Sequence, residues 1–317
     1  MAFNGTIRPQ ANFDAQKAAE QLEKAMKGFG CNKEKIIEVL CHCNNAQRQM
    51  IRTPYKTLYG KDLIKELKKE LSGDFEDVII GLMETPTKYD AVNLHKAVKG
   101  LGTKEKVLIE IICSRTNDEI HSVCNEYRDE FGETLEKAVI GDTSGDFQRL
   151  LVSLLQGNRD ESKNVDALKA NQDAHKLVAD GEKRLGTVES TFNSILVSQN
   201  LRQLDRVFLE YEKITGHPIE VAIKKEFSGN IQKALLALIQ CIQNTPKYFA
   251  NELNEAMKGL GTHDKDLIRI IISRSEIDLA IIRNLYEQMF KKSLVDSIKS
   301  ECSGAYRDSL ITVVQGN

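Results

Sequence analysis

The chain has 317 residues and a formal net charge of −2, and 28% of its residues are charged. This length allows one to three domains with a substantial core, and the near-neutral charge excludes the broad basic surface typical of nucleic-acid binding. Tryptophan is absent and aromatic residues make up 6%, which disfavours stacking platforms for bases or sugars. Few prolines and abundant leucine, isoleucine, lysine, glutamate and alanine favour a helical protein.

The amino terminus and the cysteines indicate the cellular compartment in which the protein is expected. No apolar run approaches the ~20 residues that cross a bilayer. Residues 1–6 contain neither the apolar core of a secretory signal nor a glycine at position 2 for myristoylation. Seven irregularly spaced cysteines suit a reducing compartment. We therefore expect a soluble, cytoplasmic protein without a lipid anchor of its own.

Cys41, His42 and Cys43, with Cys31 nearby, are residue types that zinc accepts as ligands. A structural zinc site needs four ligands in paired C-x2-4-C spacing, and the second pair is missing. Buried thiols are therefore the favoured interpretation. Nothing in the sequence argues for a disulfide between Cys241 and Cys302.

A glycine-rich segment recurs four times, and each copy is followed by an acidic residue. The copies occupy residues 27–31, 99–103, 181–187 and 258–262. Each acid stands two residues before a Ser-Gly pair, and the four acids are Glu70, Asp142, Glu226 and Glu301. The last glycine of the loop and the acid are 40 residues apart every time (30 to 70, 102 to 142, 186 to 226, 261 to 301). The chain is therefore a repeat protein.

The first repeat is predicted to form five short helices, because its apolar residues recur at intervals of three and four. These helices are expected over residues 15–26, 34–43, 46–58, 62–71 and 75–83. A polar segment between the second and third repeats suggests that the repeats group in pairs. The predicted organisation is a lead at 1–13, repeats at 14–86 and 87–157, a linker at 158–170, and repeats at 171–245 and 246–317.

The pairing of a glycine loop with a distant acid predicts a calcium site. Gly-x-Gly between helices allows positive φ and exposes carbonyl oxygens that a helix would consume. Three carbonyls and one bidentate carboxylate supply about five of the roughly 6–8 oxygens that Ca²⁺ takes, whereas Mg²⁺ suits such a site poorly. A phosphate oxygen could fill the gap, so that calcium and an anionic surface each raise the affinity for the other. This predicts calcium-dependent attachment to membranes.

Other interpretations of the loop are weaker. A phosphate cradle of N–H groups needs a preceding strand and a Gly-Lys-Ser/Thr ending, and an EF-hand needs its own acidic loop; the sequence has none of these. A plain turn would explain one copy but not four that are tied to an acid at constant spacing. The histidines and cysteines show no nucleophile–base arrangement, so no enzyme is predicted.

The chain resembles the annexins. The four loops, their acids, the segment Asn45-Ala46-Gln47-Arg48-Gln49 and the repeat lengths carry this resemblance over about residues 14–317. It implies an all-α curved disc of four repeats of five short helices. The convex face would bind acidic, phosphatidylserine-type phospholipid through Ca²⁺ when calcium rises, as a scaffold or a bridge between vesicles. No nucleic-acid partner is implied, and self-association on the membrane stays open.

The resemblance also implies the residues of each site, with carbonyl donors from the loop and a carboxylate from the downstream acid. The four sets are Met26, Gly28, Gly30 and Glu70; Val98, Gly100, Gly102 and Asp142; Gly181, Arg184, Gly186 and Glu226; and Met257, Gly259, Gly261 and Glu301. The loop tips expected to touch lipid are Phe29, Leu101, Leu185 and Leu260.

This chain departs from the family after each loop. The family often continues with Thr-Asp-Glu, and the first acid is replaced here by Asn32, Lys104, Val188 or His263. An N-cap threonine followed by acids stabilises a helix start by about 1 kcal/mol. The helices that follow the loops are therefore expected to begin less stably.

The resemblance also implies that four charged residues line a hydrophilic path through the disc: Asp90, Glu110, Arg115 and Arg269. Glu110 and Arg269 lie in otherwise apolar helices, so both need partners. A structural ion-pair network is favoured, because a disc resting on a bilayer does not span it. Calcium-channel-like conduction is the alternative function.

Overall fold

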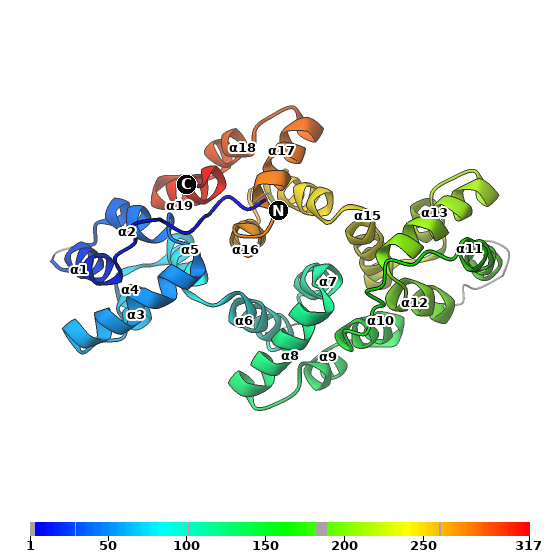
Figure 1. Cartoon of the computed structure of the whole chain (residues 1–317), viewed down its shortest axis with the longest axis horizontal. Helices are drawn as coiled ribbons and strands as arrows, with labels where there is room; N and C mark the ends of the chain where they lie inside the picture. Colours follow the sequence, from blue (N-terminus) through cyan, green and yellow to red (C-terminus); the bar gives the residue numbers. More distant parts are fainter. Residues whose placement is uncertain (1–3, 29, 101, 182–188, 260) are drawn as a thin grey trace. The chain divides into compact units, whose positions relative to one another are not determined.

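The computed structural model describes residues 4–28, 30–100, 102–181, 189–259 and 261–317. Every regular element within these ranges is a helix, which confirms the predicted all-α class (Figure 1). The helices of the first two repeats are α1 (Ala15–Met26), α2 (Lys33–Leu40), α3 (Asn45–Tyr59), α4 (Leu63–Glu70), α5 (Gly73–Met83), α6 (Pro86–Val98), α7 (Glu105–Ser114), α8 (Asn117–Phe131), α9 (Leu135–Asp142) and α10 (Gly145–Leu155).

The second half of the chain repeats this order. Its helices are α11 (Ala167–Gly181), α12 (Glu189–Ser198), α13 (Leu201–Thr215), α14 (Ile219–Glu226), α15 (Gly229–Met257), α16 (Asp264–Arg274), α17 (Leu279–Phe290), α18 (Leu294–Glu301) and α19 (Gly304–Gln315). The long α15 is two helical segments, because Asn244 has φ −165° and ψ 90°, two residues before Pro246. With this break, each repeat has five helical segments among the described residues.

The chain divides into two compact units. The first comprises residues 1–89 and 246–317, and the second comprises residues 90–245. In the first unit α5 packs against α16 and α19, so that helices of the first and fourth repeats share one core. In the second unit α10 packs against α7 and α12, which joins the second and third repeats in the same way. Isoleucine, leucine and valine side chains dominate both cores.

The two ends of the chain lie side by side in the first unit (Figure 1). The backbone N–H of Thr6 donates to the carbonyl of Ser275 at 2.7 Å, and that of Asn317 donates to the carbonyl of Thr6 at 3.3 Å. The N–H of Ala280 donates to the carbonyl of Asn4 at 3.0 Å. The amino-terminal lead is therefore paired, through its backbone, with the fourth repeat.

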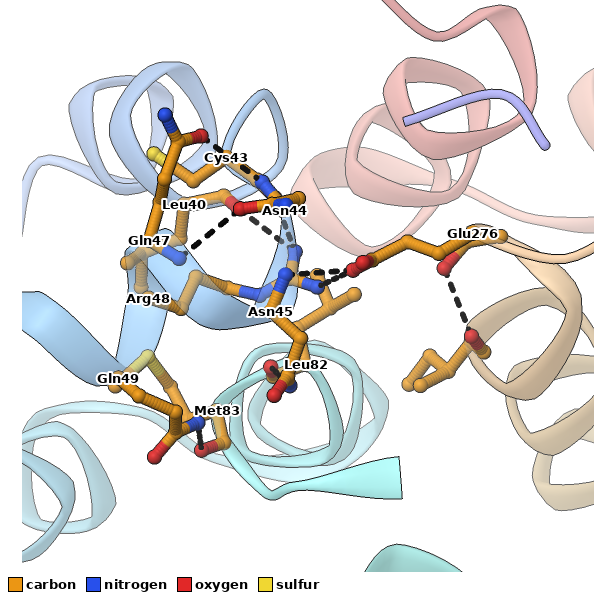
Figure 2. A network of polar contacts seen from close by, with 12 residues as sticks. Leu40, Cys43, Asn44, Asn45, Gln47, Arg48, Gln49, Leu82, Met83 and Glu276 are labelled. Atoms are coloured by element: carbon orange, nitrogen blue, oxygen red, sulfur yellow. Dashed lines mark hydrogen bonds and ion pairs between the residues drawn. The ribbon is translucent and has the colours of Figure 1, made fainter. Parts of the chain in front are cut away.

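A partly buried ion pair also joins the first repeat to the fourth (Figure 2). The Arg48 guanidinium lies 2.8 Å from the Glu276 carboxylate and donates to the carbonyls of Leu40 and Cys43. The same carboxylate accepts the N–H of Asn45 at 2.6 Å. Burial raises the pKa of Glu276 although the Arg48 charge opposes the shift, so desolvation outweighs attraction. Such a pair fixes geometry, and losing one partner is costly.

The polar linker of the second unit is bonded on both sides. The Asn117 side chain donates to the carbonyl of Arg159 at 2.8 Å. The N–H of Asp160 donates to the carbonyl of Ser198 at 2.8 Å, and the Asn200 side chain donates to the Asp160 carboxylate at 2.9 Å. The segment between α10 and α11 is thus tied to residues of both the second and the third repeat.

Replacing Arg48 by Met should lower the free energy of unfolding by about 3 kcal/mol, because Glu276 and two carbonyls would lose their donor. Urea unfolding followed by circular dichroism measures the change. The matched control is Arg52→Met on the same helix, where the side chain is exposed and its removal should cost less than about 0.5 kcal/mol. Equal effects of the two substitutions would contradict the role given to Arg48.

Candidate metal centres

One backbone hydrogen bond closes each described glycine loop. In all three loops the donor N–H lies seven residues after the acceptor carbonyl, which belongs to the last turn of the preceding helix. The donor–acceptor pairs are Asn32 and Ala25 at 2.8 Å, Lys104 and Ala97 at 2.9 Å, and His263 and Ala256 at 2.8 Å. The first, second and fourth loops therefore close in the same way.

The glycines of these loops are required by the backbone. Positive φ values occur at Gly28 (121°), Gly30 (88°), Gly102 (80°), Gly259 (102°) and Gly261 (87°). A Cβ added at any of these five would meet no atom within 4 Å, so the need is conformational and not one of space. Left-handed backbone turns carbonyl oxygens away from the helical pattern, as the sequence predicts.

Each acid of the motif is the last residue of an eight-residue helix. Glu70 ends α4, Asp142 ends α9, Glu226 ends α14 and Glu301 ends α18. A carboxylate at a helix carboxyl end is unfavourable by about 0.3–1 kcal/mol, because the unpaired carbonyls there carry negative partial charge. The four acids are therefore not placed to stabilise their own helices, and their predicted role as cation ligands would explain the placement.

Asp142 gives the clearest evidence for a cation site. The Thr103 hydroxyl donates to the Asp142 carbonyl at 2.9 Å, which fixes the second loop beside this acid. The Oδ2 atom of Asp142 is buried and has no hydrogen-bond partner, and α9 has no basic residue in its last turn. A buried carboxylate oxygen without a donor is costly. The residues present therefore fit a hard cation such as Ca²⁺.

The pKa of the Cys31 thiol indicates that Glu70 lies near the first loop. Burial raises the pKa of the Cys31 thiol, and the Glu70 charge adds to the shift while Lys33 opposes it. Since Cys31 directly follows the Gly28–Gly30 turn, the exposed Glu70 carboxylate lies close to that loop.

Glu301 has a similar neighbourhood at the fourth loop. Burial raises the pKa of the adjacent Cys302 to about 11, and the charges of Asp264 and Glu301 contribute while a hydrogen bond from Tyr306 opposes. Asp264 begins α16 directly after the loop and accepts a hydrogen bond from the Tyr306 hydroxyl at 2.9 Å. This hydrogen bond ties the start of α16 to α19, the helix that follows Glu301 and Cys302.

Several predicted site residues lie outside the described residues. They include all four loop tips, the third-loop carbonyl donors Arg184 and Gly186, and Val188 at the start of the next helix. In the third repeat Gly181 ends α11, and Glu226 ends α14 with an ion pair to Lys225 at 3.4 Å. The ligand sets and the lipid contacts stay predictions.

The helix starts after the loops differ in part from expectation. The N-cap falls one position after the expected threonine, at Asn32, Lys104 and His263. Asn32 accepts the N–H of Lys35 at 2.9 Å, so the expected weakness was wrong for α2. Lys104 and His263 make no capping bond, which leaves α7 and α16 without one. Thr103 uses its hydroxyl on Asp142 and not as a cap.

The residues implied to line a polar path are divided between the two units. Asp90 and Arg115 form a buried bidentate pair in the second unit, with nitrogen–oxygen distances of 2.6 and 2.9 Å. Burial alone would lower the pKa of Arg115, but the Asp90 carboxylate has the larger effect, so the pKa is raised. Glu110 is fully buried in the same unit, whereas Arg269 belongs to the first unit and pairs with Asp266 at 2.8 Å.

The cysteines and the helices bear on three further possibilities: a zinc site, a disulfide and a membrane-spanning segment. All seven cysteines are thiols outside any disulfide, and five are buried. Within the described ranges, no cluster of three or more His, Cys, Asp or Glu side chains is arranged to hold a metal ion, which leaves the carbonyl-based loops as the candidates. In the same ranges no helix has both the length and the apolar character needed to cross a membrane.

The repeated loop and acid define a class of helical repeat protein, and comparison with known proteins supplies the family. The annexin family model matches residues 16–82, 89–154, 172–238 and 248–313. The chain is 51% identical over 313 residues to human annexin A11, covering 99% of this chain and 62% of that protein. It therefore spans somewhat less than two thirds of that relative.

Solved structures agree. Chicken annexin V aligns over 100% of both chains with a TM-score of 0.95 and 45% identity. Calcium-bound annexin (Sm)1 aligns over 99% of this chain and 93% of its own, with a TM-score of 0.86 and 33% identity. The chain belongs to the annexin family, whose members generally bind phospholipid in a calcium-dependent manner and are generally not enzymes.

In EGTA, replacing Asp142 by Asn should leave the protein as stable as before or more stable by up to about 1 kcal/mol, because a carboxylate leaves a helix carboxyl end. The matched control is Asp146→Asn, four residues later in the first turn of α10, where losing the charge should destabilise by about 0.3–1 kcal/mol. Urea unfolding measures both. A loss of stability in Asp142→Asn equal to that in the control would count against the cation-site interpretation.

Proposed function

We propose that this chain binds acidic phospholipid membranes when Ca²⁺ is present, through the glycine loops and their acids. The observation that carries the proposal is the buried, unpartnered Oδ2 of Asp142, held beside the second loop by Thr103. A cation at this position would satisfy the oxygen and neutralise the helix end. Membership of the annexin family supports the same conclusion.

In the second repeat, the carbonyls of Val98, Gly100 and Gly102 and the carboxylate of Asp142 would hold the ion. Bound Ca²⁺ supplies positive charge and open coordination positions for a phosphate oxygen. The protein's own part is to place the donors: positive φ at Gly102 and the closing bond from Lys104 to Ala97 hold the loop, and the Thr103 hydroxyl sets its distance from α9.

The same assignment in the other repeats uses Met26, Gly28, Gly30 and Glu70, then Gly181, Arg184, Gly186 and Glu226, then Met257, Gly259, Gly261 and Glu301. Several weak sites on one chain add avidity on a surface that presents many headgroups. We therefore infer peripheral attachment to phosphatidylserine-type membranes from the cytoplasm when calcium rises. Phe29, Leu101, Leu185 and Leu260 would contact the interfacial lipid, and scaffolding or vesicle bridging would follow.

Ion conduction is not proposed. Asp90 and Arg115, two of the four residues implied for a path, neutralise each other in a buried pair. Arg269 has Asp266 as a partner three residues earlier in its own helix. These pairs give the charges a structural role that needs no permeating ion.

Co-sedimentation with phosphatidylserine vesicles across a calcium titration tests the function. Binding should require Ca²⁺ and reverse with EGTA, and Asp142→Ala should raise the calcium concentration for half-maximal binding because one site loses its only charged ligand. The matched control is Asp129→Ala in the same unit, whose side chain is 76% exposed and pairs only with Arg128 at 3.8 Å.

Vesicle binding that persists in EGTA would overturn the proposed function. Calcium requirements that are identical in Asp142→Ala and Asp129→Ala would overturn the assignment of the second site while leaving the function itself standing.

A further inference from the structure

A cavity of about 410 Å³ lies within the second unit, between the linker segment 158–163 and the helices α7, α10, α12 and α15. Its apolar wall is formed by Ile112, Leu154, Val197, Leu238 and Ile242. The volume falls within the ~300–1,000 Å³ typical of small-molecule sites, which combine apolar walls with a few polar groups. Nothing in the proposed membrane function uses this cavity.

Arg159 places a positive charge in the cavity lining. Its Nη1 atom donates to the carbonyl of Gln199 at 2.8 Å. No carboxylate of the described residues forms an ion pair with it, and burial lowers its pKa with only the Cys113 thiol opposing the shift. Arginine nevertheless stays protonated at neutral pH. The charge is therefore partly desolvated without an anionic partner.

The other charged residues of the lining are already matched or lie at the exposed surface. Arg115 is neutralised by Asp90. Asp160 accepts hydrogen bonds from Asn200 and Ser162, and Glu161 accepts one from Asn117 at 2.9 Å. Lys163 and Arg202 are exposed. Arg159 is thus the partly buried cation of this lining that forms no ion pair with a carboxylate of the described residues.

The cavity is separated from the second glycine loop along α7. The loop precedes the amino end of this helix at Lys104, whereas Ile112, Cys113 and Ser114 line the cavity at its carboxyl end. Ten residues of helix span about 15 Å. A ligand in the cavity would therefore not occupy the calcium site of the same repeat.

We propose that this cavity binds a small amphiphilic carboxylate of the fatty-acid type, with its carboxylate on the Arg159 guanidinium and its hydrocarbon chain along the apolar wall. The planar guanidinium fits a carboxylate in a bidentate arrangement. A monoanion matches the single guanidinium of Arg159 better than a phosphate dianion does, because Asp160 and Glu161 of the same lining carry negative charge. The hydrogen bonds of Asn117 and Asn200 hold the linker in place, so the site is formed before the ligand arrives.

Isothermal titration of the full chain with decanoate in EGTA tests this proposal, because EGTA removes any contribution from the calcium loops. We expect one saturable site. Decanol, which lacks the charge, and butyrate, which lacks the chain, should each bind at least tenfold more weakly. Absence of decanoate binding, or equal binding of decanol, would overturn the proposal.

Two variants locate the site. Arg159→Gln should weaken decanoate binding at least tenfold, and Val197→Phe should abolish it by filling the cavity while keeping the charge. The matched control is Arg149→Gln, an arginine of the same unit that is 73% exposed and lies outside the cavity lining. Circular dichroism and urea unfolding verify that each variant is folded, and if Arg159→Gln is not, Val197→Phe alone decides whether the ligand occupies this cavity. Unchanged affinity in Val197→Phe, or equal affinities in the Arg159 and Arg149 variants, would overturn the assignment.

Discussion

A carboxylate at the carboxyl end of a helix faces the partial negative charge of unpaired carbonyls, and this chain makes that placement in every repeat. Glu70, Asp142, Glu226 and Glu301 all end short helices. Around Asp142 the repulsion is least compensated, because α9 has no basic residue in its last turn and one carboxylate oxygen is buried without a donor. The arrangement is stable only if the rest of the fold holds it, and the proposed cation would make it favourable.

The fold holds the acids in place because their helices cannot do so alone. An eight-residue helix is far shorter than the ~12–15 residues needed for marginal stability in water. The position of each acid is therefore set by packing, as between α4 and α5 or between α18 and α19. Partly buried pairs such as Arg48 with Glu276 then fix how repeats meet within a unit. The residues of the proposed calcium sites are thus positioned by contacts remote from the loops.

Much of this organisation could be predicted from spacing. A constant interval between glycine loop and acid identifies the repeats and pairs the functional elements, because each repeat must fold in the same way. Glycine at positions of positive φ is equally predictable, since few other residues adopt that backbone. Pro246 marks the start of the fourth repeat, although the helical backbone breaks two residues earlier, at Asn244.

Side-chain partners were harder to predict, because they depend on tertiary contacts. The hydrogen bond from Thr103 to Asp142 joins residues 39 apart in the sequence. Its only sequence signal is the threonine that three loops share, at Thr103, Thr187 and Thr262. Asp266 could have been chosen as the partner of Arg269 from their spacing of three residues in one helix. The sequence predicted only that the linker is polar. The partial burial of Arg159 could not be predicted, because the apolar wall beside it comes from residues distant in the sequence.

In the function proposed above, calcium and an anionic membrane each raise the affinity of the loops for the other. Equilibrium dialysis with radioactive calcium, with and without phosphatidylserine vesicles, tests it most directly. We expect vesicles to raise the affinity for calcium, and calcium to raise the affinity for vesicles, by the same factor, since the two affinities are thermodynamically linked. Calcium affinity that is the same with and without vesicles would contradict it.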